Sequence, residues 1–453
     1  MQKPSLPKGT RDFGPIQMSR RNYILNTIRE TFQLFGYQQI ETPAMENLAT
    51  LTGKYGDEGD QLVFKVLNSG DYLKKVSSED LKAGYQPTLS KVSEKGLRYD
   101  LTVPFARYVV MNRNDITFPF KRFQIQPVWR ADRPQRGRYR EFYQCDADVV
   151  GTDSLLCEAE IIVMIRRVFS DLKLNDYSIK LNNRKILTGI SEAIGEKGNE
   201  STLCVAIDKL DKIGWEKVKE ELAERGFSVE SIEKLVPLVN LETDLEGKLS
   251  FLKEFLCNSE IGLQGVGELE EVFALLKGMG EPLDFVNFDI MLARGLSYYT
   301  GAIFEVKVNH VSIGSVSGGG RYDNLTGVFG LSDVSGVGFS FGVDRLYDVL
   351  EELVLFPDDS IQSTKILLTH FDHKAFVYAL GLMKKFRAAG IKAELYPDLT
   401  KMKKQLDFAS KKSIPFVGIC GDSEIEGNLI AFKNLETGVQ EAIPIEEAIE
   451  RLK

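Results

Sequence analysis

The segment KRFQIQPVWRADRPQRGRYREFYQCDADVV, residues 121–150, decides the fold of this chain. In its first part Phe123 and Ile125 alternate with polar residues, which is typical of a strand with one buried face. Residues 142–150 resemble a second strand, and residues 133–140 between them are rich in arginine, proline and glycine. The pattern predicts a long antiparallel hairpin with an eight-residue tip.

The hairpin carries a concentration of positive charge. Residues 121–140 contain seven lysines or arginines and a single acidic residue, Asp132. Such runs are more often solvated and salt-bridged, but here the opposing acids are missing from the neighbouring sequence. Arginine suits phosphate because it donates two parallel hydrogen bonds and stays charged, so we favour contact with polyphosphate or nucleic acid. Strand parity places basic residues on the same face as Gln144, Asp146 and Asp148.

Composition excludes several other classes of protein. The chain has 453 residues, enough for roughly three domains. A net charge of −8 argues against nucleic acid bound over the whole surface. No apolar run approaches a membrane span and the N-terminus lacks the apolar core of a secretory signal, so we expect a cytoplasmic protein. The five cysteines form no C-x-x-C pair, which predicts buried, reduced thiols rather than disulfides or a zinc site.

Periodicity divides the chain into segments of different character. A helix is expected from Pro15 to Gly36, and residues 66–95 resemble an inserted loop or hairpin without chemistry of its own. Residues 182–278 look helical and charge-rich. After a break at residues 356–360, strands alternate with helices, which predicts a small separate α/β domain with a largely parallel sheet.

Two further segments attract attention by their glycines. The triplet Gly318–Gly320 would let the backbone approach a ligand, although a tight turn is the plainer interpretation. Residues 336–342 miss the G-x-G-x-x-G spacing, and no P-loop motif is present, so both kinds of nucleotide site are disfavoured. His370 and His373 have a spacing that could bind a metal, but a solvated turn between strand and helix is favoured and no metal site is expected.

Together these motifs resemble the histidyl-tRNA synthetase family of class II aminoacyl-tRNA synthetases over nearly the whole chain. KGTRDF at residues 8–13 is similar to the family's N-terminal signature, and YQQIETP at residues 37–43 to class motif 1. Residues 129–144 resemble motif 2, and residues 336–345 resemble motif 3. Residues 294–299 and 319–323 resemble two peptides peculiar to the histidine enzymes.

The resemblance implies an α+β fold: a class II catalytic domain, with an antiparallel sheet flanked by helices, a helical insertion and a C-terminal α/β anticodon-binding domain. The expected boundaries are residues 1–181 and 279–356 for the two parts of the catalytic core, 182–278 for the insertion and 364–453 for the anticodon-binding domain.

The resemblance also assigns roles to individual residues. Arg294 and Arg130 are implied to be catalytic at the reacting carboxylate and α-phosphate, and Arg133 and Arg136 to bind tRNA. ATP is expected at Arg130, Asp132, Arg138 and Arg345. Histidine is expected at Asp100, Thr102, Gln144, Asp148, Tyr298, Tyr299 and Tyr322, whose carboxylates, hydroxyls and amide suit an ammonium and an imidazole. Asp132 stands where motif 2 usually has glutamate, and Ser297, often aspartate in the family, receives no role.

The implied reaction forms histidyl-adenylate from ATP and histidine and then esterifies tRNA(His). Mg²⁺ is expected on the ATP phosphates, with few protein ligands, and a homodimer is expected. The main alternative interpretation is a regulatory subunit of ATP phosphoribosyltransferase, which resembles the catalytic domain. Such a subunit lacks an anticodon-binding domain, whereas residues 365–453 supply one here. A proline or threonine synthetase shares motifs 1–3, but not the peptides at Arg294 and Gly319.

Overall fold

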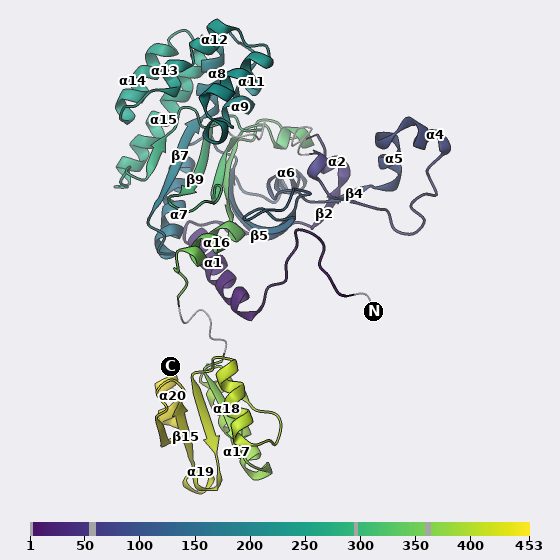
Figure 1. Cartoon of the computed structure of the whole chain (residues 1–453). Helices are drawn as coiled ribbons and strands as arrows, with labels where there is room; N and C mark the ends of the chain where they lie inside the picture. The colour runs from purple at the N-terminus through teal and green to yellow at the C-terminus, as the bar shows by residue number, and fades with distance from the viewer. Residues whose placement is uncertain (1–2, 54–59, 294–297, 358–363) are drawn as a thin grey trace. The chain divides into compact units, whose positions relative to one another are not determined.

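The computed structural model describes residues 3–53, 60–293, 298–357 and 364–453 (Figure 1). These residues divide into two compact units, one of residues 3–14 and 21–356 and the other of residues 15–20 and 357–453. Within the described residues, no helix has both the length and the apolar character needed to cross a membrane.

The larger unit is built on an eight-stranded sheet. Neighbouring strands are antiparallel except at its two edges, where β1 pairs with β5 and β7 with β8 in parallel. From edge to edge the strands are β1 (Gln38–Gln39), β5 (Phe120–Trp129), β6 (Glu141–Val150), β11 (Gly336–Gly342), β10 (Ser317–Tyr322), β9 (Ala302–Val308), β7 (Tyr177–Asn183) and β8 (Val286–Phe288). The expected antiparallel sheet is therefore confirmed.

Strands β5 and β6 form the predicted antiparallel hairpin, but the tip between them comprises residues 130–140 and not only the expected residues 133–140. Arg122 lies opposite Asp148, and Gln126 lies opposite Gln144. Because side chains alternate along a strand, these polar residues share one face of the sheet, while Phe123 and Cys145 share the other.

The apolar face of the sheet packs against helices. Phe32 of α1 (Pro15–Leu34) lies with its ring centroid 5.5 Å from that of Phe123 and 6.2 Å from that of Phe341. Phe169 of α7 (Leu156–Asp171) reaches Phe341 at 5.9 Å. α16 (Val343–Glu352) follows β11 directly. This core holds the sheet rigid, so that its polar face can position a site.

Helix α6 (Thr102–Met111) contacts the polar face, where the Phe105 ring centroid lies 4.1 Å from the Arg122 guanidinium, and a second, three-stranded sheet precedes this helix in the chain. This sheet is formed by β2 (Met45–Asn47), β4 (Lys95–Leu97) and β3 (Lys65–Val66). The short helix α2 (Leu48–Leu51) and α6 share a small apolar core. Residues 98–102 connect this sheet to α6 beside the end of β5, where Trp129 N donates to the Arg98 carbonyl oxygen at 3.1 Å.

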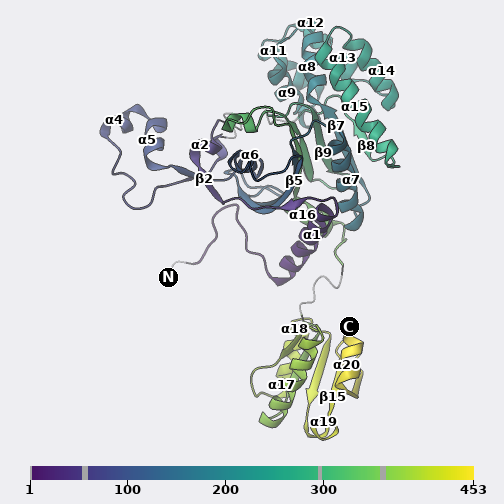
Figure 2. The ribbon, with the colours of Figure 1, turned by 180° about the vertical axis from the view of Figure 1, so that it is seen from behind.

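The prediction of a loop or hairpin at residues 66–95 is wrong in its secondary structure. The pairing of β3 with β4 does form a hairpin base, but the segment also contains α4 (Ser78–Ala83) and α5 (Tyr85–Val92), which project as a lobe (Figures 1 and 2). Ser77 and Asp80 form a capping box that starts α4, and Gly84, at φ +102°, separates the helices. That S-x-x-D spacing is a local helix signal in the sequence.

Helices follow β7, as expected for residues 182–278, and gather beside β7 and β9 in Figure 1. Gly189 of α8 and Gly262 of α15 touch so closely that a Cβ on Gly189 would lie 2.5 Å from the Gly262 Cα. The helices are α8 (Arg184–Ala193), α9 (Glu200–Ile207), α10 (Leu210–Ile213), α11 (Trp215–Glu224), α12 (Val229–Glu233), α13 (Val236–Val239), α14 (Leu245–Phe255) and α15 (Glu260–Gly278).

The smaller unit contains a five-stranded sheet in the order β13, β12, β14, β15, β16. Its first three strands are parallel as predicted, but β15 and β16 add an antiparallel hairpin that the sequence reading missed. The strands are β12 (Ile366–His370), β13 (Ala393–Leu395), β14 (Phe416–Cys420), β15 (Leu429–Asn434) and β16 (Gln440–Pro444). The helices are α17 (His373–Ala388), α18 (Met402–Lys411), α19 (Asp422–Gly427) and α20 (Ile445–Leu452).

Candidate active site

A cavity of about 320 Å³ opens on the polar face of the large sheet. It is lined by β6, β10 and β11, by the hairpin tip, by the start of α16, and by Tyr99, Asp100 and Thr102 at the start of α6. The structure brings together around it eleven of the residues expected to bind histidine or ATP: Asp100, Thr102, Arg130, Asp132, Arg138, Gln144, Asp148, Tyr298, Tyr299, Tyr322 and Arg345. Arg294, like Ser297, lies outside the described residues.

Glycines make room for this cavity where two strands meet. Gly338 of β11 lies opposite Asp148 of β6, and a Cβ on Gly338 would lie 2.0 Å from Asp148 Oδ1. A Cβ on Gly319 would lie 2.1 Å from the Gly338 carbonyl oxygen. The interpretation of Gly318–Gly320 as a tight turn is therefore wrong, because these residues form the middle of β10 and are needed for close strand packing.

The inner end of the cavity is buried and charged. Arg122, with no exposed surface, forms an ion pair with Asp148 at 2.7 Å and lies 4.1 Å from the Phe105 ring centroid. The Tyr322 hydroxyl donates to Asp148 Oδ1 at 2.5 Å. Burial raises the pKa of Asp148, although Arg122 opposes the shift, and burial raises the pKa of Tyr322 well above its usual value. The phenol is thus a proton donor at neutral pH.

Asp146 lies beside this group. Burial is the main cause that raises the pKa of its carboxyl to about 7; Arg122 opposes the shift and Asp148 adds to it. The Gln144 side-chain amide donates to Ser340 Oγ at 3.1 Å, and the Ser340 hydroxyl also hydrogen-bonds the Asp146 carboxyl. Sequence reasoning gave Asp146 no role and counted Arg122 only among the basic residues of the hairpin. Strand parity placed the basic residues on the face of Asp146 and Asp148, but it did not pair Arg122 with Asp148.

The outer end of the cavity is rich in arginine. Arg130 Nε donates to the Tyr99 carbonyl oxygen at 3.0 Å, and the guanidinium lies 4.2 Å from the Tyr99 ring centroid and 5.2 Å from that of Phe142. Arg345 donates through Nε to the Gly137 carbonyl oxygen at 2.8 Å. These contacts orient two cations toward a common space, which is the arrangement that stabilises developing charge on a phosphate.

The hairpin is better compensated by acids than its own sequence indicates. Arg136 forms an ion pair with Glu352 of α16, and Lys121 forms one with Glu160 of α7 at 2.6 Å. The acids missing from the neighbouring sequence therefore come from distant segments. Arg133 and Arg136 are exposed and do not line the cavity, in contrast to Arg138.

The N-terminal segment also contributes to the site. Its resemblance to the family signature predicted no contact for Arg11 or Arg21. Arg11 forms an ion pair with Asp344 at the start of α16, and its guanidinium lies 3.3 Å from the Tyr139 ring centroid. Arg21 binds the same carboxylate at 2.5 Å. Arg140 N donates to the Gly9 carbonyl oxygen at 2.9 Å, so this segment fastens the hairpin tip to α16.

Candidate metal ligands elsewhere have other partners. His370 is buried rather than solvated, and its Nε2 lies 3.0 Å from the Tyr396 carbonyl oxygen. Among the described residues, no group of three or more His, Cys, Asp and Glu side chains is arranged to hold a metal ion. Of the cysteines, Cys257 is exposed, contrary to the expectation of burial, and the other four are buried.

Comparisons with known proteins agree with this geometry. A family model described as Histidyl-tRNA synthetase matches residues 90–346, and one described as Anticodon binding domain matches residues 363–453. The chain is 58% identical to a histidine–tRNA ligase of Cytophaga hutchinsonii, covering 100% of both chains, and 57% identical to one of Phocaeicola vulgatus, covering 100% of this chain and 99% of the other. A crystal structure of histidyl-tRNA synthetase from Nostoc sp. PCC 7120 is similar with a TM-score of 0.84 and 30% identity, covering 100% of both chains.

Proposed function

The chain belongs to the histidyl-tRNA synthetase family, and from that premise we propose how its own residues share the two steps of the reaction. The enzyme activates L-histidine with ATP to histidyl-adenylate and pyrophosphate. It then transfers histidine to the 3′ end of tRNA(His) and releases AMP. The rival readings as a regulatory subunit or as a synthetase for proline or threonine are set aside by these relatives.

Histidine occupies the inner end of the cavity in this proposal. Asp100, Thr102, Gln144, Asp148, Tyr298, Tyr299 and Tyr322 bind it. The buried Asp148, held by Arg122 and Tyr322, supports this assignment because an acceptor with fixed partners is already oriented for a ring N–H. A pocket that satisfies both ring nitrogens rejects analogues without them, since its own buried polar groups would remain unpaired.

ATP occupies the outer end. Arg130 contacts the α-phosphate, Arg138 and Arg345 the outer phosphates, and Asp132 the adenine. Arg294, which is outside the described residues, is assigned in this proposal to the reacting carboxylate and α-phosphate because of its place in the family peptide. The histidine carboxylate attacks the α-phosphate in line without a general base, because it is already a nucleophile. Rate enhancement then comes from positioning and from the cations around the transferred group. ATP enters as its Mg²⁺ complex, in which the phosphates supply most of the ligands.

The proposal also includes tRNA binding, the domain boundaries, the oligomeric state and the cellular location. Arg133 and Arg136, exposed on the hairpin tip, bind tRNA(His). Residues 1–181 and 279–356 form the catalytic core, 182–278 the insertion and 364–453 the anticodon-binding domain. β1 is a short, exposed strand at the edge of the large sheet, and it lies within the motif 1 segment. The backbone groups of an edge strand can pair with another chain, which supports a homodimer. The enzyme works in the cytoplasm, where ATP and tRNA serve protein synthesis.

The single observation that carries the assignment of residues is one cavity with a buried acidic end and an arginine-rich end. Amino-acid-dependent ATP–pyrophosphate exchange tests it. We expect exchange with histidine and none with proline or threonine, and a loss of about 100-fold in Arg294→Ala, as for other donors to a developing charge. Unchanged exchange in Arg294→Ala would remove that residue from the mechanism.

A further inference from the structure

Among the described residues, the buried end of the cavity has more acidic than basic side chains. Asp100, Asp146 and Asp148 face it from two elements, and Arg122 is the cation that acts on both Asp146 and Asp148. All four side chains are almost fully buried, with at most 4% of their surface exposed. A buried carboxylate needs a positively charged or hydrogen-bonding partner, or else a proton. The acid that lacks such a partner within the protein is therefore the one available to a cationic group of a ligand.

Asp148 already has its partners. Tyr322 donates to Oδ1 at 2.5 Å, and the Arg122 guanidinium lies 2.7 Å from Oδ2. The ion pair balances the Asp148 charge within the protein. A cationic group that bound only at Asp148 would therefore compete with Arg122 for the same carboxylate.

Asp146 differs from Asp148 in this respect. It is flanked on β6 by Gln144 and Asp148, and it lies opposite Gln124 of β5 and Ser340 of β11. Within the part of the chain that the structure describes, Asp146 lines the cavity, and its Oδ1 is buried and has neither a hydrogen-bond partner nor an ion pair, whereas Asp148 Oδ2, also without a hydrogen-bond partner, has its ion pair with Arg122. A buried carboxylate oxygen without a partner on the wall of a substrate pocket is an acceptor for a ligand.

We propose that Asp146 is a substrate-binding residue, which supplies the counter-charge for the ammonium group of histidine, whereas Asp148 is held in its pair with Arg122. The proposal rests on the proposed function, because it takes histidine as the occupant of this cavity. It adds to the pocket an acid that the resemblance did not assign, and it gives Arg122 the role of a positioning residue that keeps Asp148 from taking the same charge.

The proposal has a consequence for protons. The groups that act on Asp146 are Arg122 from β5, Asp148 from β6, Ser340 from β11, and Asp100 before α6, and the pKa of its carboxyl is about 7 in the empty cavity. Some of the empty sites therefore hold a proton on Asp146 at neutral pH. A bound cation favours the carboxylate and lowers the pKa, so histidine binding releases protons near pH 7.

Calorimetric titration of the full chain with L-histidine, in two buffers of different ionisation enthalpy, measures this release. We expect the wild type to release a fraction of a proton per site at pH 7. Asp146→Asn is expected to bind histidine about 10- to 100-fold more weakly, because a charged hydrogen bond is lost, and to release none. The matched control is Asp153→Asn, which removes an exposed acid beside the same sheet and is expected to match the wild type.

A second variant keeps the proposal testable if Asp146→Asn folds poorly. The Ser340 hydroxyl lowers the pKa of Asp146, so Ser340→Ala is expected to move the pH of maximal proton release upward. Tight histidine binding in Asp146→Asn, or an unchanged proton release in both variants, would overturn the proposal. Histidine-dependent ATP–pyrophosphate exchange by the wild type distinguishes a failure of the proposed function from a failure of the Asp146 proposal. Absence of exchange refutes the proposed function. Exchange in the wild type, together with unchanged histidine binding and proton release in the variants, refutes only the role of Asp146.

Discussion

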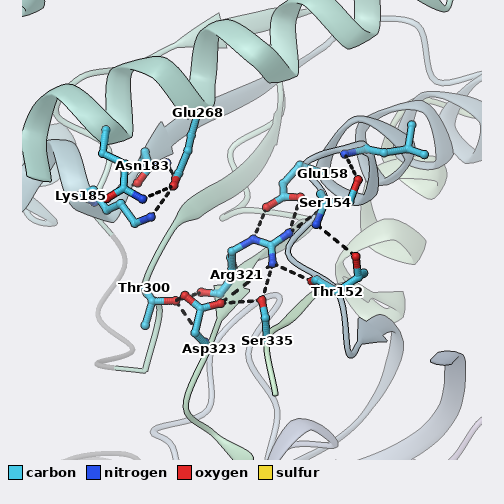
Figure 3. A network of polar contacts seen from close by, with 12 residues as sticks. Thr152, Ser154, Glu158, Asn183, Lys185, Glu268, Thr300, Arg321, Asp323 and Ser335 are labelled. Carbon is cyan, nitrogen blue, oxygen red and sulfur yellow. Dashed lines mark hydrogen bonds and ion pairs between the residues drawn. The ribbon is translucent and has the colours of Figure 1, made fainter. Parts of the chain in front are cut away.

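Glu158 of α7 and Arg321 of β10 form a buried, two-pronged ion pair in the larger unit (Figure 3). Arg321 Nε lies 2.5 Å from Glu158 Oε1, and Nη2 lies 2.7 Å from Oε2. Arg321 also donates to Ser335 Oγ at 2.5 Å, and Ser335 donates to Asp323 at 2.7 Å. Asp323 accepts from Thr300 Oγ1 at 2.6 Å, so the network extends to the residue that follows the tyrosine pair of the pocket.

Loss of Arg321 should destabilise the larger unit strongly. Arg321→Ala leaves Glu158 buried without its counter-charge, which costs about 3–5 kcal/mol of unfolding free energy. Urea unfolding followed by tryptophan fluorescence measures it, because both tryptophans, Trp129 and Trp215, lie in this unit. The matched control is Lys234→Ala, which breaks an exposed pair with Glu230 and should cost no more than about 0.5 kcal/mol. Equal effects of the two substitutions would contradict a structural role for the buried pair.

A methyl group at Gly338 should close the histidine end of the cavity. Gly338→Ala places a Cβ against Asp148 Oδ1, so the carboxylate must leave its position between Arg122 and Tyr322. We expect the KM for histidine in the exchange reaction to rise by about 100-fold or more, as when a buried hydrogen-bonded charge loses its partners.

Gly267→Ala is the control for that substitution, since a Cβ there meets nothing within 4 Å and the site lies in α15. It should leave the KM for histidine unchanged and stabilise the fold by about 0.5–1 kcal/mol. An unchanged KM in Gly338→Ala would mean that histidine does not use Asp148.

The contacts of Arg11 predict an effect on ATP rather than on histidine. Arg11 connects Asp344 to Tyr139 of the hairpin tip, next to Arg138. Arg11→Ala removes an ion pair and a cation–π contact, so the KM for ATP is expected to rise about 10-fold while calorimetric binding of histidine stays the same. Arg113→Ala, which removes an exposed arginine, should change neither value. A parallel loss of histidine affinity in Arg11→Ala would show that the segment supports the whole cavity.

The sequence predicted those parts of the structure that depend on local pattern. Alternation along residues 121–150 was sufficient for the hairpin and for the face that its polar residues share, whereas the pairing of individual residues came only from the structure. The capping box of α4 was an equally local signal, but it was not recognised within a polar segment.

Long-range pairing could not be predicted in this way. The Arg136–Glu352 contact joins residues 216 positions apart, and Arg11 meets Asp344 across 333 positions. Nothing near either arginine indicates its partner, so the hairpin tip looked uncompensated. The same reason explains why Arg321 was read only as part of a family peptide and not as the centre of a buried network.

Arg136 should affect the tRNA step and leave amino-acid activation intact. It is exposed, it does not line the cavity, and it is held by Glu352 at the surface. Arg136→Ala is expected to raise the KM for tRNA(His) several-fold and to reduce the salt dependence of tRNA binding by about one phosphate contact, with unchanged ATP–pyrophosphate exchange. Glu352→Gln provides the opposite change, since it removes the competing carboxylate and should lower the KM for tRNA(His). A variant Arg136→Ala that loses exchange but still binds tRNA would place this arginine in the ATP site instead.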